Sequence, residues 1–144
     1  MNLQDCIQFA NEFPICYIAT MDGDQPRVRA LSMVLADERG FGFCTLSPKQ
    51  FSKQLHENPK IEICFYNNAT EFPDMKMMRV TGKAEFTDEK VLMDKAIETR
   101  KGLSDVIGQP VEPLLEIFRI STGEAFFWTI MDNLKEPDIE RIRF

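Results

Sequence analysis

The fold of this chain is constrained most by a series of short strand-like segments joined by turn signals, with only brief helical patterns between them. The clearest pair is Ile15–Met21 and Pro26–Leu35, separated by Asp22-Gly23-Asp24. Gly and Asp between two apolar runs are typical of a tight hairpin turn. We therefore expect these two segments to pair as antiparallel strands.

Further strands are predicted by the same criteria. Residues 41–45 follow a turn at 37–40, and residues 61–66 alternate with the period of two that suits a half-buried strand. Residues 77–86 form a longer strand in which Gly82 indicates a bulge or bend. Residues 115–130 are either two strands or one bent strand around Ser121-Thr122-Gly123.

Helical patterns are short. Apolar residues spaced along residues 3–10 predict a first helix that is capped by Asn2 and ends at Phe13-Pro14. Another is expected from Asp88 to about Arg100, capped by Thr87, and a looser segment follows it. Six or more strands with few helices predict a mainly antiparallel β-barrel with α additions, in a single domain of residues 1–144.

A third helix follows residues 41–45 directly. Ser47 is its expected cap, Pro48 its first helical residue, and Gln50 the partner that completes a capping box, with Asn58-Pro59 as the stop. Phe51 and Leu55 form an apolar pair that can pack on a sheet. Since the strand and helix carry neither a Gly-rich dinucleotide motif nor a P-loop, those nucleotide-binding folds are excluded.

Composition limits the partners. The net charge of -6 argues against a nucleic-acid partner, because binding a phosphate backbone requires a basic surface. The single histidine, His56, argues against a zinc site, and we expect no metal. Four scattered cysteines without a CxxC pair suit a reducing compartment. No apolar run is long enough to span a membrane, and no signal peptide is recognisable, so a cytoplasmic protein is expected.

Within this acidic chain, basic residues gather at two places. Lys49 and Lys53 share one face of the predicted helix, near N–H groups that can bind an anion. Arg27 and Arg29 leave the same face of the second strand, and arginine matches phosphate oxygens in a bidentate way. The alternatives are an ordinary surface helix and two arginines at the solvated end of a hairpin. Together, however, the two groups predict a phosphate site.

No conventional catalytic set is present. The chain lacks GxSxG and HExxH motifs, and His56 lies near the end of a surface helix, where we expect it to be solvated. Redox or group-transfer chemistry would therefore need a cofactor. Phe126, Phe127 and Trp128 form an aromatic group that can pack in the core or between subunits, and one ring could cover a flat cofactor.

Three segments carry a family resemblance: YIATMDGDQPRVRAL, FGFCTLSPKQFSKQLHENPKIEICF and MRVTGKAEF. They resemble the pyridoxamine 5'-phosphate oxidase-like FMN-binding split-barrel family, in particular its small single-domain bacterial members. The resemblance runs from about Phe13 to Phe86 and returns faintly at GEAFFW and the final IRF. It implies a six-stranded antiparallel split β-barrel that forms a homodimer, with FMN at the subunit interface.

The resemblance also implies site residues. The PRVR strand would place Arg27, Val28, Arg29 and Ala30 against the flavin ring and phosphate, and the strand end would add Cys44 and Thr45 beside the flavin and its ribityl chain. Lys49 would meet the phosphate, with Lys53 a weaker candidate, and Trp128 is our candidate from the partner subunit.

The chain departs from true pyridoxamine phosphate oxidases in two places. Its helix opens Ser47-Pro48-Lys49-Gln50 where those enzymes have serine-arginine-lysine, and its tail lacks the histidine that helps bind their substrate. Vitamin B6 oxidation is therefore not expected. The function expected is an FMN-dependent oxidoreductase acting on a small-molecule substrate or electron donor; the alternative is a non-catalytic flavin, haem or deazaflavin binder with a storage, sensing or stress-response role.

Overall fold

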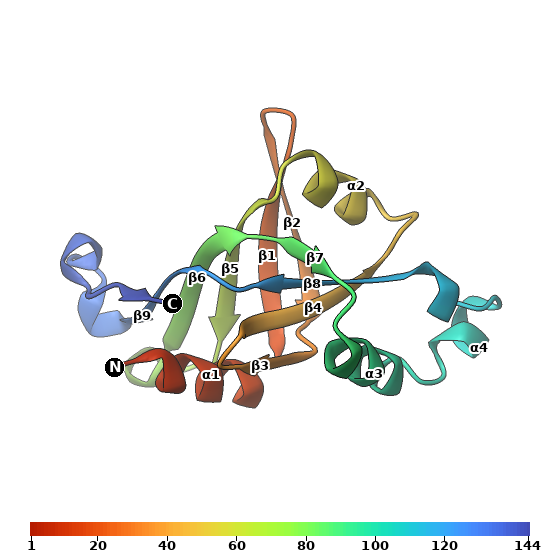
Figure 1. Ribbon diagram of the computed structural model, residues 1–144. Coiled ribbons are helices and arrows are strands. Elements are labelled where there is room, and N and C mark those ends of the chain that lie inside the picture. The colour runs from red at the N-terminus through yellow and green to blue at the C-terminus, as the bar shows by residue number, and fades with distance from the viewer.

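Ten strands form two antiparallel sheets in the structure, a computed structural model that describes residues 1–144 (Figure 1). The six-stranded sheet has the order β10-β9-β6-β5-β1-β2, and the four-stranded sheet has the order β3-β4-β8-β7. The strands are β1 (Ile15–Asp22), β2 (Gln25–Ser32), β3 (Leu35–Asp37), β4 (Gly40–Leu46), β5 (Lys60–Tyr66), β6 (Lys76–Lys83), β7 (Glu85–Thr87), β8 (Leu115–Ile120), β9 (Gly123–Thr129) and β10 (Ile142–Arg143).

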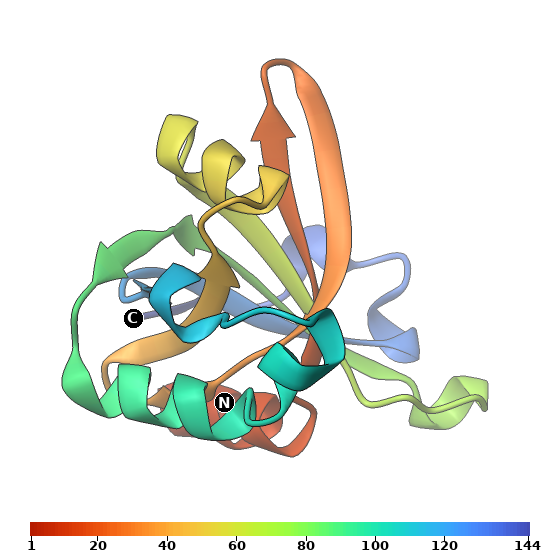
Figure 2. The same cartoon turned by 90° about the vertical axis from the view of Figure 1, so that its right-hand side faces the viewer.

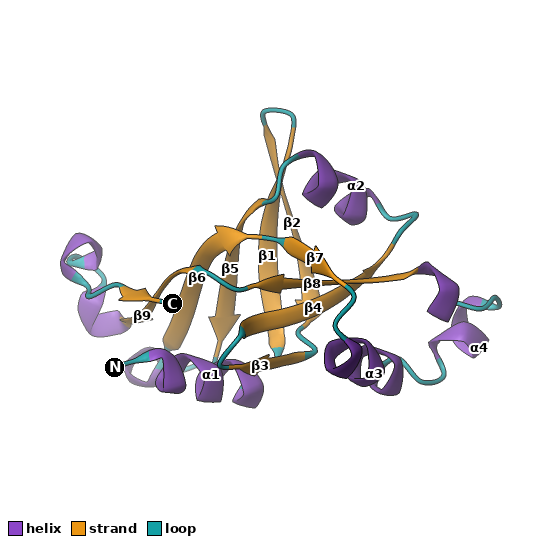
Figure 3. Cartoon of the chain, viewed as in Figure 1, coloured by secondary structure: helices purple, strands orange, loops and turns teal.

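Helices lie around the strands rather than between them (Figure 3). They are α1 (Leu3–Glu12), α2 (Gln50–Glu57), α3 (Lys90–Thr99) and the short α4 (Leu103–Ile107), with four single-turn 3₁₀ segments at 72–74, 112–114, 130–132 and 136–138. This mainly antiparallel arrangement confirms the expected fold class. None of the helices is long and apolar enough to cross a membrane.

The β1–β2 hairpin is confirmed. Asp22 pairs with Gln25 across the turn, and Gly23 adopts a φ of 62°, a left-handed conformation that glycine adopts without strain. The predicted continuation of the second strand to Leu35 is wrong, because β2 ends at Ser32 and the chain crosses to the other sheet. Met33 and Val34 are consecutive and both buried, which a half-buried strand of period two does not allow.

The long strand expected at 77–86 is also divided between the sheets. β6 ends at Lys83, and β7 begins at Glu85 in the four-stranded sheet. A Cβ added at Gly82 would lie 2.5 Å from the Ile120 side chain and 2.8 Å from the Thr122 carbonyl oxygen, so only glycine permits this close approach. Residues 115–130 form two strands, β8 and β9, one in each sheet.

Apolar side chains from both sheets and α1 fill the core. Ile18, Ile63 and Val80 on the six-stranded sheet are fully buried, as are Phe43 and Phe118 on the other sheet. Their burial removes from water the side chains that the alternating pattern placed on one face of each strand. The core therefore holds the two sheets in fixed relation.

One of the predicted helix caps is confirmed and another is wrong. Asn2 caps α1, as the sequence indicated, and the structure adds a capping box with Asp5. The cap predicted for α2 is wrong: Lys49 occupies the N-cap position and no side chain caps the helix. The Ser47 N–H instead donates to the carbonyl oxygen of Leu114, which keeps residues 47–48 in a turn. The helix expected from Asp88, α3, starts later, at Lys90, and the Thr87 hydroxyl accepts a hydrogen bond from the N–H of Glu89.

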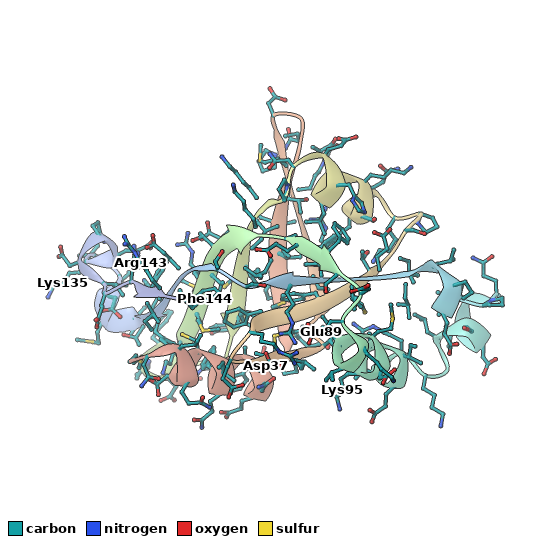
Figure 4. The ribbon with its side chains drawn as sticks, in the orientation of Figure 1. Asp37, Glu89, Lys95, Lys135, Arg143 and Phe144 are labelled. Atoms are coloured by element: carbon teal, nitrogen blue, oxygen red, sulfur yellow. The ribbon has the colours of Figure 1, made fainter.

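A buried arginine links two strands of the four-stranded sheet, β8 and β3, to the loop before α3. Arg119 on β8 donates to both carboxylate oxygens of Asp37 at 3.0 and 3.2 Å and to both of Glu89 at 2.7 and 2.9 Å. Figure 4 labels these two acidic residues, which come from the end of β3 and the loop before α3. Because Arg119 is 4% exposed, its charge depends on these partners.

Candidate functional site

A pocket of 270 Å³ opens where the edge strand β2 meets the end of β4. Figure 2 views the side of the molecule on which the β1–β2 hairpin, α2 and the α3–α4 region come together. The pocket, called the cationic pocket below, is lined by Arg29, Leu31, Ser32, Cys44, Thr45, Leu46, Lys49, Phe51, Arg100, Leu103 and Leu115.

The charge of this pocket contrasts with that of the chain. Arg29, Lys49 and Arg100 line it, and no aspartate or glutamate does. None of the three cations forms an ion pair. In a protein with a net charge of -6, three unpaired cations around one cavity favour an anionic ligand.

Arg29 is held in position by neutral groups. Its guanidinium donates to the Thr20 hydroxyl at 2.7 Å and to the Gln54 side-chain oxygen at 2.7 Å, and it lies 4.6 Å from the centre of the Phe51 ring. Burial lowers the pKa of Arg29 from its usual value. These contacts orient a charged fork and leave it without a counter-ion, which suits bidentate recognition of a phosphate.

The two lysines of α2 are separated by the structure. Lys49 lies at the helix N-terminus and lines the cationic pocket, whereas Lys53 is exposed and lies outside it. The pair Phe51 and Leu55 is buried at 4% and 1% exposure, as predicted. Packing of these two side chains holds the helix against the core and fixes Lys49 at the pocket's edge.

The arginines of β2 are also separated. Arg27 is exposed near the hairpin tip and pairs with Asp22 at 3.2 Å, so only Arg29 lines the pocket. Val28 and Ala30 are exposed, with side chains on the opposite face of the strand. Their contribution to a ligand in the pocket would come from the main chain, since β2 is an edge strand with backbone groups free of sheet pairing.

Cys44 and Thr45 line the pocket from the end of β4. Burial raises the pKa of the Cys44 thiol, although Arg100 and Lys49 oppose that effect, so a protonated thiol is expected at neutral pH. The Thr45 hydroxyl is buried and has no hydrogen-bond partner in the protein. An unpaired buried hydroxyl is costly, and a ligand in this pocket could satisfy it.

Sequence patterns did not indicate Arg100, which follows α3 and is far along the chain from Arg29 and Lys49, the other two cations of the pocket. Its guanidinium donates to the carbonyl oxygen of Ser32 at 3.0 Å and to the Thr99 hydroxyl at 2.9 Å. The only signal was a cation at the end of a helix, which ordinarily indicates interaction with the helix dipole. Tertiary packing alone brings it to β2.

Trp128 lies far from the pocket within one chain. It is on β9, which three strands separate from β2. It points away from the core, because the adjacent Phe127 points inward and packs edge-on against Phe9. Trp128 can therefore meet a ligand in the cationic pocket only as a residue of a second subunit.

The histidine is engaged outside the cationic pocket. His56 Nε2 lies 2.6 Å from a carboxylate oxygen of Glu116, and its ring stacks on Phe86 with the centroids 3.9 Å apart. The Ser52 hydroxyl donates to the other Glu116 oxygen. Serine and histidine thus contact the same carboxylate and not each other, which is not the arrangement of a nucleophile and its base.

The lining residues fit a ligand that carries a phosphate and an apolar flat part. Unpaired Arg29 and Lys49 suit the phosphate, the free Thr45 hydroxyl suits a polar chain, and Leu31, Leu46 and other apolar side chains line the remainder. Ligand pockets commonly measure about 300–1,000 Å³. At 270 Å³ the pocket lies just below that range, so a large ligand would need a further wall from outside this chain.

The two antiparallel sheets with a pocket at their open edge define a split β-barrel. The sequence matches the family model described as "Pyridoxamine 5'-phosphate oxidase" over residues 3–129, and the chain belongs to that family. The family resemblance found in the sequence is therefore confirmed. Among curated proteins, none matches this sequence.

Several solved structures share the fold. A NimC/NimA family protein from Clostridium acetobutylicum has a TM-score of 0.75 and 24% identity, with 99% of this chain and 92% of that one covered. A FAD-binding protein from Mesorhizobium loti has a TM-score of 0.70 and 16% identity, covering 88% and 94%. HutZ, the haem storage protein from Vibrio cholerae, has a TM-score of 0.65 and 17% identity, covering 90% and 95%.

Proposed function

We propose that this protein binds FMN in the cationic pocket, at the interface of a homodimer, and acts as an oxidoreductase on a small-molecule substrate or electron donor. The observation that carries the proposal is a pocket with three unpaired cations and no carboxylate, in an acidic chain of this family. A flavin-binding relative of the same fold supports it.

Arg29 and Lys49 would hold the phosphate. Arg29 offers a fork already oriented by Thr20 and Gln54, and Lys49 adds a point charge at the start of α2. The Thr45 hydroxyl would bond to the ribityl chain, and main-chain groups of residues 28–30 and the Cys44 side chain would contact the ring. When bound, the flavin supplies hydride transfer, and the protein supplies position and electrostatics.

The dimer would complete the pocket. Ile15, Tyr17 and Val28 are 54%, 48% and 69% exposed, and they share the outward face of β1 and β2. Exposed apolar patches of this kind mark interaction surfaces. A second copy seated on that face would cover it, and we propose that the partner subunit's Trp128 then closes the flavin site.

We also propose that the protein is located in the cytoplasm. All four cysteines are free thiols, three of them buried. Burial raises the pKa of Cys6 to about 11 and that of Cys16 to about 12, which makes these thiols unreactive at neutral pH. Such a set suits the reducing cytoplasm.

Binding without turnover is the second candidate, because HutZ, a haem storage protein, shares the fold. The pocket favours flavin over haem, since no histidine lines it and the pKa of the Cys44 thiol is raised. Reduction of bound flavin by NADH or NADPH without oxygen, with reoxidation by oxygen or another acceptor, would support the oxidoreductase. If no donor reduces the flavin, binding alone is favoured. Competition against FMN would reveal a deazaflavin ligand.

The proposal is tested by titrating the cofactor-free protein with FMN and following flavin fluorescence. Lys49→Ala should weaken binding by about 1–3 kcal/mol, the range for a charge-assisted hydrogen bond. Lys53→Ala is the matched control and should leave affinity unchanged, because Lys53 lies on the same helix outside the pocket. Absence of saturable binding by the wild-type protein would end the proposal, and equal effects of the two substitutions would remove Lys49 from the site.

A further inference from the structure

We infer that Gln54 is a positioning residue that makes the cationic pocket selective for a phosphorylated flavin, because it holds Arg29 along one edge with a neutral oxygen. This inference rests on the proposed function, since it takes the phosphate of FMN as the group that Arg29 meets. Gln54 is 7% exposed and does not line the pocket. Its effect on a ligand is therefore exerted through Arg29.

Three side chains form a closed ring of hydrogen bonds beside the pocket. Arg29 donates from Nη1 to the Thr20 hydroxyl at 2.7 Å and from Nη2 to Gln54 Oε1 at 2.7 Å. The Thr20 hydroxyl donates to the same Gln54 oxygen at 2.6 Å. Thr20 and Gln54 are both buried, so little water competes for these bonds. Because Gln54 Oε1 accepts two hydrogen bonds, the orientation of its amide group is fixed.

The ring leaves one edge of the guanidinium group for a ligand. The two acceptors are adjacent, one on each terminal nitrogen of Arg29, so they occupy the end of the fork. Nη1 also donates to the carbonyl oxygen of Ile18 at 3.3 Å. Of the five N–H groups, this leaves one on Nε and one on Nη2, which lie on the same side of the fork. Two parallel N–H groups are the arrangement that binds two phosphate oxygens at once.

Gln54 also links Arg29 to the helix that carries Lys49. Lys49 is the N-cap residue of α2, and Gln54 lies on the side of α2 that meets the β1–β2 hairpin (Figure 2). Phe51 of the same helix lies under the guanidinium group, 4.6 Å from ring centre to Cζ. One helix therefore sets the positions of both cations that are proposed to hold the phosphate.

The neutral charge of Gln54 matters as much as its position. A carboxylate at this place would orient Arg29 equally well, but it would be a counter-ion and would repel a phosphate. Gln54 accepts the hydrogen bond without cancelling the charge, and Arg29 forms no ion pair elsewhere. The full charge of Arg29 is thus available to a ligand.

The alternative role for Gln54 is structural. Its oxygen satisfies the buried Thr20 hydroxyl, so its replacement is expected to lower stability in either case. A purely structural role would weaken the binding of FMN and of riboflavin, which lacks the phosphate, to the same extent. A positioning role changes only the part of the affinity that the phosphate contributes. The ratio of the dissociation constants of riboflavin and FMN therefore separates the two roles.

The test measures this ratio by fluorescence titration of the cofactor-free protein with each flavin. Gln54→Met keeps the length of the side chain and removes the acceptor. It should lower the ratio at least about threefold, the effect of one hydrogen bond, while riboflavin affinity changes less than about twofold. Gln54→Glu keeps the acceptor and supplies a counter-ion, and it should lower the ratio as well. Thr20→Val removes the other acceptor and should have the effect of Gln54→Met, which keeps the test independent of one variant's folding.

Gln50→Met is the matched control, because Gln50 is exposed on the same helix and makes no hydrogen bond to Arg29; it should keep the wild-type ratio. A wild-type ratio in Gln54→Glu, or in the variants that remove an acceptor, would overturn the inference, as would equal losses for the two flavins. A wild-type protein that binds the two flavins equally would instead overturn the proposed phosphate site. The thermal stability of each variant reports any folding defect separately.

Discussion

At the residue scale, the site depends on which side chains of a strand face the pocket. Arg27 and Arg29 share a face by periodicity, yet only Arg29 lines the pocket, because Arg27 lies near the solvated hairpin tip and pairs with Asp22. Sequence spacing predicts the face and does not predict how far along the strand the pocket extends. Arg100 was missed for a related reason, since no local pattern records a contact made across the fold.

The Thr45 hydroxyl provides a test at this scale. Thr45→Val keeps the shape and removes a buried hydroxyl that has no partner in the protein. Without a ligand, we expect Thr45→Val to be more stable than wild type by about 1 kcal/mol, because an unsatisfied polar group is eliminated. FMN affinity should fall, because the ribityl chain loses its partner.

Chemical denaturation and FMN titration measure these two effects separately. Thr45→Ser retains the hydroxyl and should retain FMN affinity. If Thr45→Val destabilised the unliganded protein and bound FMN like wild type, the hydroxyl would have no role in the ligand site.

At the element scale, the sequence patterns predicted where most strands lie and that β1 pairs with β2, and they predicted the ends of elements less well. β2 and β6 stop where the chain crosses between the two sheets, although the sequence pattern predicted that each strand would continue past that point. The cap of α2 was mispredicted because the Ser47 N–H finds the Leu114 carbonyl oxygen, a partner from a distant segment. Tertiary contacts therefore set the boundaries that local patterns leave open.

For the four-stranded sheet, we predict that Arg119 is essential to stability. Arg119→Met should lower the free energy of unfolding by about 3–5 kcal/mol, the cost of leaving buried charges unpaired. Urea denaturation at neutral pH measures this. Arg39→Ala is the control, since Arg39 is 54% exposed while pairing with the same two carboxylates; its cost should be about 0–1 kcal/mol. A similar loss of unfolding free energy in both variants would show that the buried Arg119 contributes no more to stability than the exposed Arg39.

The same cluster predicts a dependence on pH. Burial would raise the pKa of Asp37, but hydrogen bonds from Arg39 and the charge of Arg119 hold it below its ordinary 3.8. Hydrogen bonding from Arg119 lowers the pKa of Glu89 below its ordinary 4.5. These carboxylates therefore stabilise the fold fully above their ordinary values, and the stabilisation is lost as the pH falls through the lowered pKa values.

Unfolding measured across the acidic range should show wild type losing stability there more steeply than Arg119→Met. An identical acid dependence in the two proteins would contradict the assigned coupling.

At the scale of the whole molecule, the sequence predicted a mainly antiparallel barrel with short helices, and its family resemblance predicted the split form. Neither periodicity nor composition indicated that the pocket within one chain would be small and open. The outward apolar face of β1 and β2 supplies a physical reason for a second subunit. Assembly and ligand binding are then expected to depend on each other.

Tyr17→Glu tests that dependence, because it places a charge on the apolar face without touching the cationic pocket. We expect a monomeric mass by light scattering together with weakened FMN binding, as a buried carboxylate would oppose association. Val106→Glu alters an exposed apolar residue on α4, 84% exposed, and should leave both properties unchanged. A wild-type protein that is monomeric with FMN bound would refute the interfacial site.

The central claim is our proposal that the cationic pocket binds the phosphate of FMN. The most direct measurement compares FMN with riboflavin, which has the same ring and ribityl chain without the phosphate. Contacts of the phosphate with Arg29 and Lys49 should make the dissociation constant of FMN lower than that of riboflavin by at least about tenfold at moderate ionic strength, and added salt should narrow the difference. Equal affinity for the two flavins, or no binding of either, would contradict the assignment.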